Sequence, residues 1–231
     1  LNTVFLQLIV MIMSFAPLGV FCLIGKFVIA DGLDIFQDVL AYVVLLIALL
    51  LFHAAFTYSI FLKFIGGLNP LTFFSKMKDV ALFAFSTSSS AATIPVTLRT
   101  VNQDLGVNQN VASFVVPVGA TINMDGTAIM QGLATVFIAQ MSGIDLTLFQ
   151  YVQVVLLAVA TSIGTAAVPS AGTITLIIIL QQFNLPLEAI GIILAVDRVL
   201  DMLRTSVNVT GDAAIACIVA KTENQLDENI F

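Results

Sequence analysis

Charged side chains are scarce in this sequence. Only 10% of the 231 residues are Asp, Glu, Lys or Arg, whereas 59% are hydrophobic, and the mean hydropathy is +1.08. A soluble domain is typically about 25% charged, so this chain has too few charges to solvate a globule of its size. The solvent for most of it must therefore be lipid, and the sequence predicts an integral membrane protein.

Positive charge is scarcer still. Eight Lys and Arg residues against fourteen Asp and Glu residues give a net charge of −6 and an isoelectric point near 4.4. Nucleic acid is excluded as a partner because there is no basic patch to meet its phosphates. Cys22 and Cys217 lie in apolar runs without metal-ligand spacing, so neither a disulfide framework nor a zinc site is expected. The start at Leu1 shows no basic region or cleavage site of a signal peptide, and we expect a piece of a longer chain.

Uncharged stretches mark the expected membrane segments. Residues 1–25 and 39–62 carry no Asp, Glu, Lys or Arg, and each is longer than the roughly 20 residues that cross a hydrocarbon core. Each stretch therefore predicts one transmembrane helix. His53 lies in the second stretch, where a lone imidazole more often faces a partner helix than carries protons.

Two later stretches are apolar but interrupted by small and polar residues. Residues 80–98 contain a run of hydroxyl side chains before Pro95, and residues 146–187 carry no charge over 42 positions. The second stretch has twice the length of one crossing, and a re-entrant hairpin fits it better than two short crossings. Repeated broken segments of this kind point to the binding site of a secondary transporter.

Polar residues gather on one face of the last segment. Five of them share this face: Asp197, Asp201, Arg204, Asn208 and Asp212. At about 100° per residue they fall within a stripe about 80° wide. Residues 189–196 and 213–220 on either side are mostly apolar, which places the stripe in the membrane, where an unpaired charge costs about 3 kcal/mol or more. We therefore expect the stripe to face the protein interior.

The charges on this stripe indicate a ligand. If Asp125, Asp201 and Asp212 meet Arg204 in one cavity, its net charge is −2, and burying that charge is prohibitive unless cations join it. Alkali cations prefer carboxylate and carbonyl oxygens, and a guanidinium suits a carboxylate held by two hydrogen bonds. A second carboxylate could rest on backbone N–H groups at the hairpin tips. The residues predict an acidic amino acid, its ammonium on Asp201 and a carboxylate on Arg204, carried together with cations.

Four motifs then carry a resemblance to a known family. They are Thr87-Ser-Ser-Ser-Ala-Ala-Thr-Ile-Pro95, Asn123-Met-Asp-Gly-Thr127, Gly164-Thr-Ala-Ala-Val-Pro-Ser-Ala-Gly172 and Asp201-Met-Leu-Arg-Thr-Ser-Val-Asn-Val-Thr-Gly-Asp212. In this order they resemble the signature segments of the sodium-coupled glutamate/aspartate transporters, in the dicarboxylate/amino acid:cation symporter family. The resemblance covers essentially the whole chain, but only the C-terminal part of the family architecture.

This resemblance implies an all-α membrane protein with two re-entrant helical hairpins and two interrupted helices. Residues 1–30 would be a scaffold-type transmembrane helix, and residues 31–231 a transport domain that moves as an elevator against a trimeric scaffold. The implied elements of that domain are a helix at 39–63, a hairpin at 74–104, a broken helix at 110–140, a hairpin at 148–185 and a helix at 189–220. The resemblance also implies a multi-pass protein of the plasma (inner) membrane, homotrimeric at full length.

The resemblance further assigns a substrate, L-glutamate or L-aspartate, and its contacts. Arg204, helped by Thr127, should hold the side-chain carboxylate. Asp201 should take the ammonium, with Thr205 close by. The other contacts would surround the α-carboxylate and close the site: Asn208 and the backbone at Ser90, Ser88, Val168 and Gly172.

Sodium is the coupling ion that the resemblance implies. Its expected ligands fall into three sets: Asp212 with carbonyl groups of Gly119, Asn123 and Asn208; carbonyl groups of Thr121, Ser162, Ile163 and Thr165; and Asp125 with Asn123. Some family members carry an arginine where this chain has Ser88 or Met202, and Arg198 lies one turn from the site.

Two alternatives stay open. A proton-coupled glutamate or C4-dicarboxylate symporter is the nearer one, although a dicarboxylate has no ammonium for Asp201. A channel or a non-transporting membrane subunit is the second, and it would need no ammonium and carboxylate sites at all. An enzyme is not expected, because no nucleophile–base pair or catalytic metal cluster appears and the single His53 is remote in sequence from the polar stripe.

Overall fold

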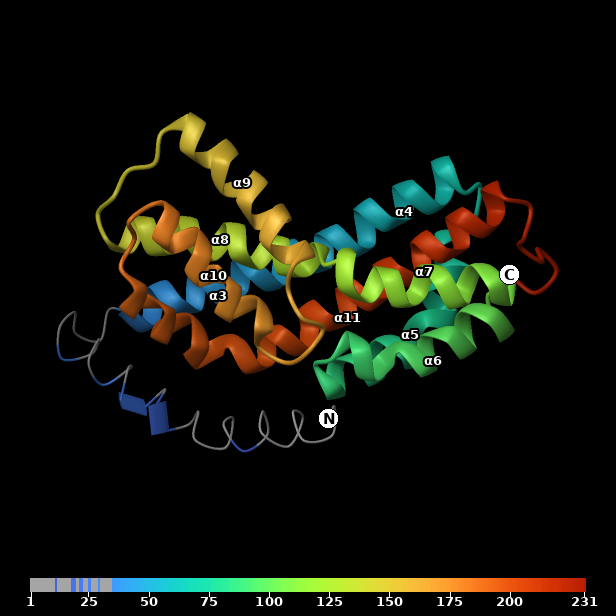
Figure 1. The fold of residues 1–231 in the computed structure, drawn as a ribbon, viewed down its shortest axis with the longest axis horizontal. Helices are drawn as coiled ribbons and strands as arrows, with labels where there is room; N and C mark the ends of the chain where they lie inside the picture. The colour runs from blue at the N-terminus through green and yellow to red at the C-terminus, as the bar shows by residue number, and fades with distance from the viewer. Residues whose placement is uncertain (1–10, 12–17, 20, 23–24, 26–28, 30–34) are drawn as a thin grey trace.

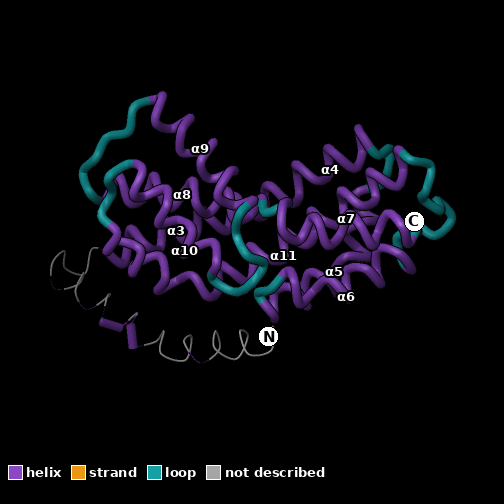
Figure 2. The backbone as a smooth tube through the Cα atoms, in the orientation of Figure 1, coloured by secondary structure: helices purple, strands orange, loops and turns teal. Residues whose placement is uncertain are grey.

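The structure, a computed structural model, describes residues 11, 18–19, 21–22, 25, 29 and 35–231. The expected scaffold-type helix at residues 1–30 lies almost wholly outside the described residues. The described part is helical, with short loops and no strand (Figure 2), and one isolated antiparallel bridge joins Val107 to Leu226. The all-α class expected from the sequence is confirmed for this part of the chain.

The first long helix contains two π-helical turns. Its segments are α3 (Ile35–Phe52), η1 (His53–Thr57), α4 (Tyr58–Ile60) and η2 (Phe61–Ile65). Among the described helices it alone is long and apolar enough to cross a bilayer, and only 17% of its most apolar stretch is buried. Bonds between residues five apart in η1 bring His53 and Tyr58 to the same face, although an α-helix would separate them by about 140°. Both side chains contact the same carboxylate, described below.

Three pairs of helices follow. They are α5 (Pro70–Thr87) with α6 (Ser90–Gln103), α7 (Gln109–Ile122) with α8 (Asp125–Met141), and α9 (Leu148–Ile163) with α10 (Ala171–Gln182). Ser88 ends α5 in the left-handed conformation, at φ 50°, and the Ser89 hydroxyl caps α6 by accepting the N–H of Ala92 at 3.2 Å. The α5–α6 turn is therefore only two residues long, whereas the α9–α10 turn spans residues 164–170.

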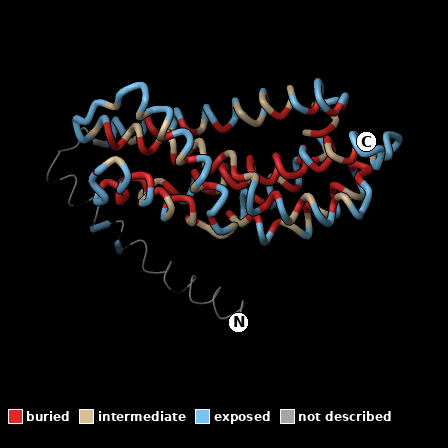
Figure 3. Tube along the Cα trace, turned by 45° about the horizontal axis from the view of Figure 1, so that its top comes forward, coloured by how far each residue is buried: buried red, intermediate tan, exposed pale blue. Residues whose placement is uncertain are grey.

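The last helix, α11 (Ile190–Thr222), follows the short turn η3 (Leu187–Ala189) and forms the centre of the structure. It contacts α3, α5, α6, α7, α8 and α10. Figure 1 shows it running along the bundle, and Figure 3 shows buried residues concentrated in the interior of the bundle. The interruption of the broken helix expected at residues 110–140 lies between α7 and α8, whereas α11 is continuous over 33 residues. Its charged residues find partners in one another and in neighbouring helices, so the backbone does not have to open.

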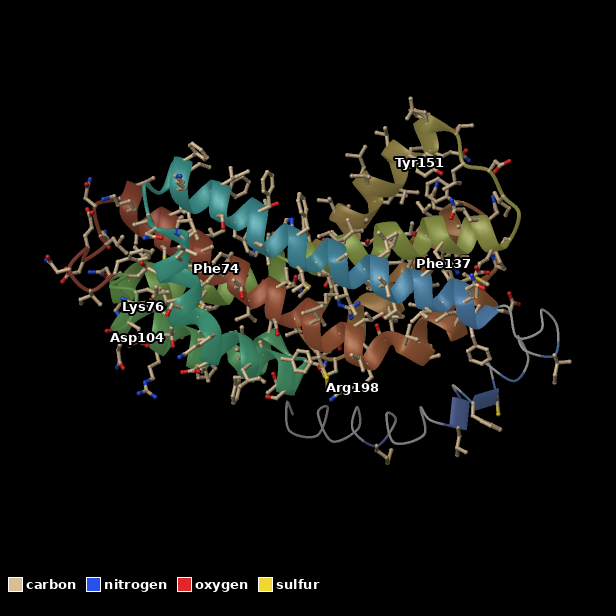
Figure 4. All side chains as sticks on the ribbon, turned by 180° about the vertical axis from the view of Figure 1, so that it is seen from behind. Phe74, Lys76, Asp104, Phe137, Tyr151 and Arg198 are labelled. Atoms are coloured by element: carbon tan, nitrogen blue, oxygen red, sulfur yellow. The ribbon has the colours of Figure 1, made fainter. Side chains whose placement is uncertain are left out.

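The segment after α11 turns back onto the loop between α6 and α7. The N–H of Asn108 donates to the carbonyl of Gln225 at 2.9 Å, and the N–H of Asp227 donates to the carbonyl of Gly106 at 2.8 Å. Lys76 and Asp104 lie together at the same end of the bundle (Figure 4), where the Lys76 ammonium donates to the Asp104 carbonyl at 2.9 Å. Gly106 has a φ of +70°, and a Cβ there would lie 2.4 Å from the Asp227 carbonyl oxygen. This position therefore requires glycine on two grounds.

We expect Gly106→Ala to lower the free energy of unfolding by more than Gly143→Ala. Both glycines have a positive φ, but Gly143 has nothing within 4 Å of its would-be Cβ. Left-handed strain alone should cost about 1–2 kcal/mol in Gly143→Ala, and Gly106→Ala should add the displacement of the returning segment. Thermal unfolding of purified protein in detergent, followed by circular dichroism, checks this. Equal losses in the two variants would contradict the contact with Asp227.

Candidate functional site

A small cavity of about 20 Å³ lies where the two interhelical turns meet α8 and α11. All nine residues expected to bind substrate line it: Ser88, Ser90, Thr127, Val168, Gly172, Asp201, Arg204, Thr205 and Asn208. They come from the α5–α6 turn, α6, α8, the α9–α10 turn, α10 and α11. The fold thus brings these residues together, and their part in binding stays a prediction.

The two turns close the cavity by touching each other. The Ser89 hydroxyl donates to the Ala167 carbonyl at 2.9 Å, and the Ala91 N–H donates to the same oxygen at 3.4 Å. Figure 2 shows the two turns, drawn in teal, side by side near the middle of the molecule. The Ser88 hydroxyl is buried and has no hydrogen-bond partner among the described residues. A polar group that lines the cavity is therefore left for a ligand.

Arg204 and Asp201 pair with each other in this cavity. Arg204 Nη2 lies 2.5 Å from Asp201 Oδ1, and the other Asp201 oxygen accepts the N–H of Ser170 at 2.9 Å. Arg204 is only 2% exposed and Asp201 only 3%, so each charge supplies the counter-charge that the other needs in a dry interior. An amino acid that carries a carboxylate and an ammonium could replace both halves of this pair.

Asp197 is a second acid beside Arg204 that the sequence analysis left without a role. Its Oδ1 lies 3.6 Å from Arg204 Nη1 and accepts the hydroxyl of Thr173 at 2.6 Å. Its place on the polar stripe, one turn before Asp201, was the sequence signal for it. Arg198 is exposed and lies on the outer face of α11 (Figure 4), and it does not line the cavity.

Asp125 lies in a separate cluster and does not line the cavity. Its Oδ2 is 3.2 Å from His53 Nε2 and accepts the Tyr58 hydroxyl at 3.1 Å; that hydroxyl also lies 3.2 Å from the Val207 carbonyl. The expectation that His53 faces a partner helix is confirmed. Its distance in sequence from the polar stripe gave no sign of this contact, because the packing of α3 and η1 against α8 and α11 makes it.

Asp212 forms the core of the first expected sodium set. It is 2% exposed, its Oδ1 accepts the Asn123 amide at 3.0 Å, and no Lys, Arg or His of the described residues forms an ion pair with it. A Cβ on Gly119 would lie 2.6 Å from Asp212 Oδ1. Asn208 lies one turn earlier on α11, where its Oδ1 accepts the N–H of Gly126 at 2.8 Å. A buried carboxylate without a cationic side chain fits an alkali cation.

The other two expected sodium sets are arranged differently. The second set lies at the ends of α7 and α9, which contact each other, and comprises Thr121, Ser162, Ile163 and Thr165. Ser162 and Thr165 are buried, whereas Thr121 and Ile163 are exposed. In the third set, the Asn123 amide turns to Asp212 while Asp125 turns to His53. Among the described residues, no three His, Cys, Asp or Glu side chains form a group that could hold a metal ion.

Comparison with known proteins gives the family. The model of the sodium:dicarboxylate symporter family matches residues 1–222. The chain belongs to this family. It is similar to Excitatory amino acid transporter 2 of Homo sapiens, at 43% identity over 95% of this chain and 38% of that protein. It is also similar to the Excitatory amino acid transporter of Caenorhabditis elegans, at 40% identity over 95% of this chain and 44% of that protein.

A third relative agrees with these two. Excitatory amino acid transporter 1 of Homo sapiens is 41% identical over 95% of this chain and 41% of its own length. The chain thus spans about two fifths of the length of the curated relatives that it matches. The cavity and the cluster of His53, Tyr58 and Asp125 both lie within the part of the relatives' length that this chain covers.

Gln131 is a further residue that the sequence analysis missed. This fully buried side chain donates to the Gly172 carbonyl at 3.0 Å and to the Thr175 hydroxyl at 2.8 Å, and it accepts the Thr161 hydroxyl at 2.8 Å. It therefore ties α8 to both α9 and α10. A lone amide in an apolar helix was the available signal, since a buried amide needs partners for both its donor and its acceptor.

We expect Tyr58→Phe to lower the free energy of unfolding by about 1–3 kcal/mol, because the carboxylate of Asp125 loses its hydrogen bond from the buried Tyr58 hydroxyl. Tyr151→Phe is the matched control, since that hydroxyl lies on an exposed residue of α9 (Figure 4), and its effect should stay within about 0.5 kcal/mol. Thermal unfolding in detergent measures both. If the two variants lose the same amount of stability, the hydrogen bond from Tyr58 to Asp125 does not stabilise the protein.

Proposed function

We propose that the protein containing this chain is a secondary active transporter that carries L-glutamate or L-aspartate together with sodium. Membership in the sodium:dicarboxylate symporter family and the similarity to proteins named excitatory amino acid transporters support this proposal. The observation that carries it is the buried Arg204–Asp201 pair that lines the small cavity. This pair offers one cation for a carboxylate and one anion for an ammonium.

Each charged group of the substrate has a partner in this proposal. Arg204, with Thr127, binds the side-chain carboxylate, and Asp201, with Thr205, binds the ammonium. The α-carboxylate meets Asn208 and the start of α6 at Ser90, where the positive end of the helix dipole favours an anion. The turn at residues 164–170 covers the substrate, with contacts from Val168 and Gly172.

Sodium enters the proposal through Asp212, a buried acid that forms no ion pair among the described residues. Asp212, with carbonyl groups of Gly119, Asn123 and Asn208, binds one ion, since its carboxylate otherwise has no cationic partner among the described residues. Carbonyl groups at Thr121, Ser162, Ile163 and Thr165 bind a second ion, and Asp125 with Asn123 serves a third. The substrate brings a net charge of −1 to a site that is already acidic, and the sodium ions offset this excess of negative charge.

Movement across the membrane is proposed from the family. The helix pairs α5–α6 and α9–α10 act as re-entrant hairpins of a transport domain at residues 31–231, which moves as an elevator against a homotrimeric scaffold in the plasma (inner) membrane. Apolar residues exposed along α9, such as Leu148, Phe149 and Leu156, support a surface that faces lipid or scaffold. Transport is proposed for a protein of the relatives' full length, since this chain spans about two fifths of that length.

Binding of L-aspartate and L-glutamate, measured by calorimetry in sodium or in choline, tests the proposal. We expect binding in sodium only, and Arg204→Ala should weaken it about 100-fold or more, because truncation leaves a carboxylate without its buried partner. Arg198→Ala removes the same charge from the exposed face of the same helix, and it should leave the affinity unchanged. Succinate, which has no ammonium, should bind weakly.

Each alternative gives a different result in this experiment. Binding that ignores sodium and tightens at low pH would replace the proposal with a proton-coupled symporter, and tight binding of succinate would replace it with a dicarboxylate carrier. Absence of binding to the full-length protein would overturn it in favour of a channel or a non-transporting subunit.

The sodium site has its own test in Gly119→Ala. The added methyl group meets the Asp212 carboxylate, and overpacking of this kind should raise the sodium concentration for half-maximal L-aspartate binding by about tenfold. Gly132→Ala is the matched control, since nothing lies within 4 Å of that Cβ position in α8. Titration of binding against sodium measures the shift. An unchanged sodium dependence in Gly119→Ala would remove Asp212 and Gly119 from the ion site.

A further inference from the structure

Asp197 is a buried acid that the proposed substrate and sodium contacts do not use. It lies on α11, one turn before Asp201, and is only 2% exposed. Of its two oxygens, Oδ1 has partners, whereas Oδ2 is buried and has no hydrogen-bond partner among the described residues. Burial removes the hydration of a carboxylate at a large free-energy cost, so its neighbours must offset that cost.

The two partners of Asp197 belong to different parts of the site. Thr173, in the first turn of α10, donates its hydroxyl to Oδ1 at 2.6 Å, and the same oxygen faces Arg204 Nη1 at 3.6 Å. Thr173 is itself completely buried and directly follows Gly172, which lines the cavity. One oxygen therefore joins the helix behind the α9–α10 turn to the guanidinium that is proposed to bind the substrate.

Asp201, the next acid on α11, contacts both Arg204 and the α9–α10 turn. Asp201 binds Arg204 through one oxygen and the N–H of Ser170 through the other. The proposed ammonium of the substrate, however, draws Asp201 away from Arg204. Asp197 is then the acid that stays with Arg204 after the substrate has entered, because it does not line the cavity.

We propose that Asp197 is a positioning residue that couples Arg204 to closure of the α9–α10 turn through Thr173. Opening of the turn removes the Thr173 hydroxyl and lets water reach Asp197. Loss of Arg204 removes its counter-charge, and hydration of Asp197 then favours the open turn. Arg204 held in place thus stabilises the closed turn, and the closed turn holds Arg204 ready for a carboxylate. This inference rests on the proposed function for the identity of the substrate, but the coupling itself exists without substrate.

Amide hydrogen exchange of residues 165–175 tests the coupling in the ligand-free, full-length protein. Thr173→Val should speed exchange about tenfold, because it removes a hydrogen bond to a buried charge. Thr173→Ser keeps the hydroxyl and should exchange like the wild type. Thr97→Val is the matched control, since that buried hydroxyl donates only to Thr93 in its own helix, and it should leave residues 165–175 unchanged.

A double variant separates coupling from a merely structural contact. Arg204→Ala should also speed exchange of residues 165–175, because Asp197 loses its counter-charge. Adding Asp197→Asn should slow it again by about threefold or more, since a neutral amide needs no counter-charge and still accepts the Thr173 hydroxyl. Equal exchange in Thr173→Val and Thr97→Val would overturn the inference. Failure of Asp197→Asn to slow exchange in the Arg204→Ala protein would overturn it as well.

Release of bound L-aspartate in sodium links the coupling to the proposed function. Thr173→Val should release it about tenfold faster than the wild type, and Thr173→Ser at the wild-type rate. An unchanged release rate in Thr173→Val overturns the inference while the proposed function stands. A wild-type protein that binds no L-aspartate overturns the proposed function, and the exchange measurements then decide the coupling by themselves.

Discussion

Charges buried on one helix set the arrangement of everything around them. Asp197, Asp201 and Arg204 lie on successive turns of α11 and are at most 3% exposed. Ions in a dry interior are stable only when partners of opposite charge and hydrogen-bond donors surround them. The donors come from the α9–α10 segment, as the Ser170 N–H and the Thr173 hydroxyl. The position of that segment over the cavity is therefore a consequence of the charges beneath it.

Breaks between helices deliver the remaining polar groups to the same region. The α5–α6 turn places Ser88 and the start of α6 at the cavity, and the break between α7 and α8 places Asn123 beside Asp212. Irregular backbone at this depth is tolerated only where protein or a polar cavity satisfies its N–H and C=O groups. In contrast, α11 is continuous, and its charged side chains lie on one face that points into the site. The broken helices thus bring polar groups from their ends to the site, and the continuous helix brings its charged side chains.

The acids around the site divide into two groups with different surroundings. Asp197 and Asp201 share Arg204, whereas Asp125 and Asp212 have neutral hydrogen-bond donors and a single histidine. A shared guanidinium suits exchange with an amino acid, and carboxylates without a permanent cation suit mobile cations. The proposed substrate and sodium sites therefore have different chemistry, although they lie only a few turns apart on α11. Gly119 allows α7 to approach Asp212 closely at the proposed sodium site.

Composition and periodicity by themselves determined the helical membrane class and the polar face of α11, because these features depend on local spacing and on the cost of charge in lipid. The family resemblance supplied the interruption near Asn123. Family motifs identified the residues that line the cavity. Only the tertiary structure decided which acids share a partner. His53 reaches Asp125 through a π-helical turn, and Thr173 reaches Asp197 across the packing of α10 on α11. Local sequence carries no signal for such pairs, since contacts between distant helices depend on how all the helices pack together.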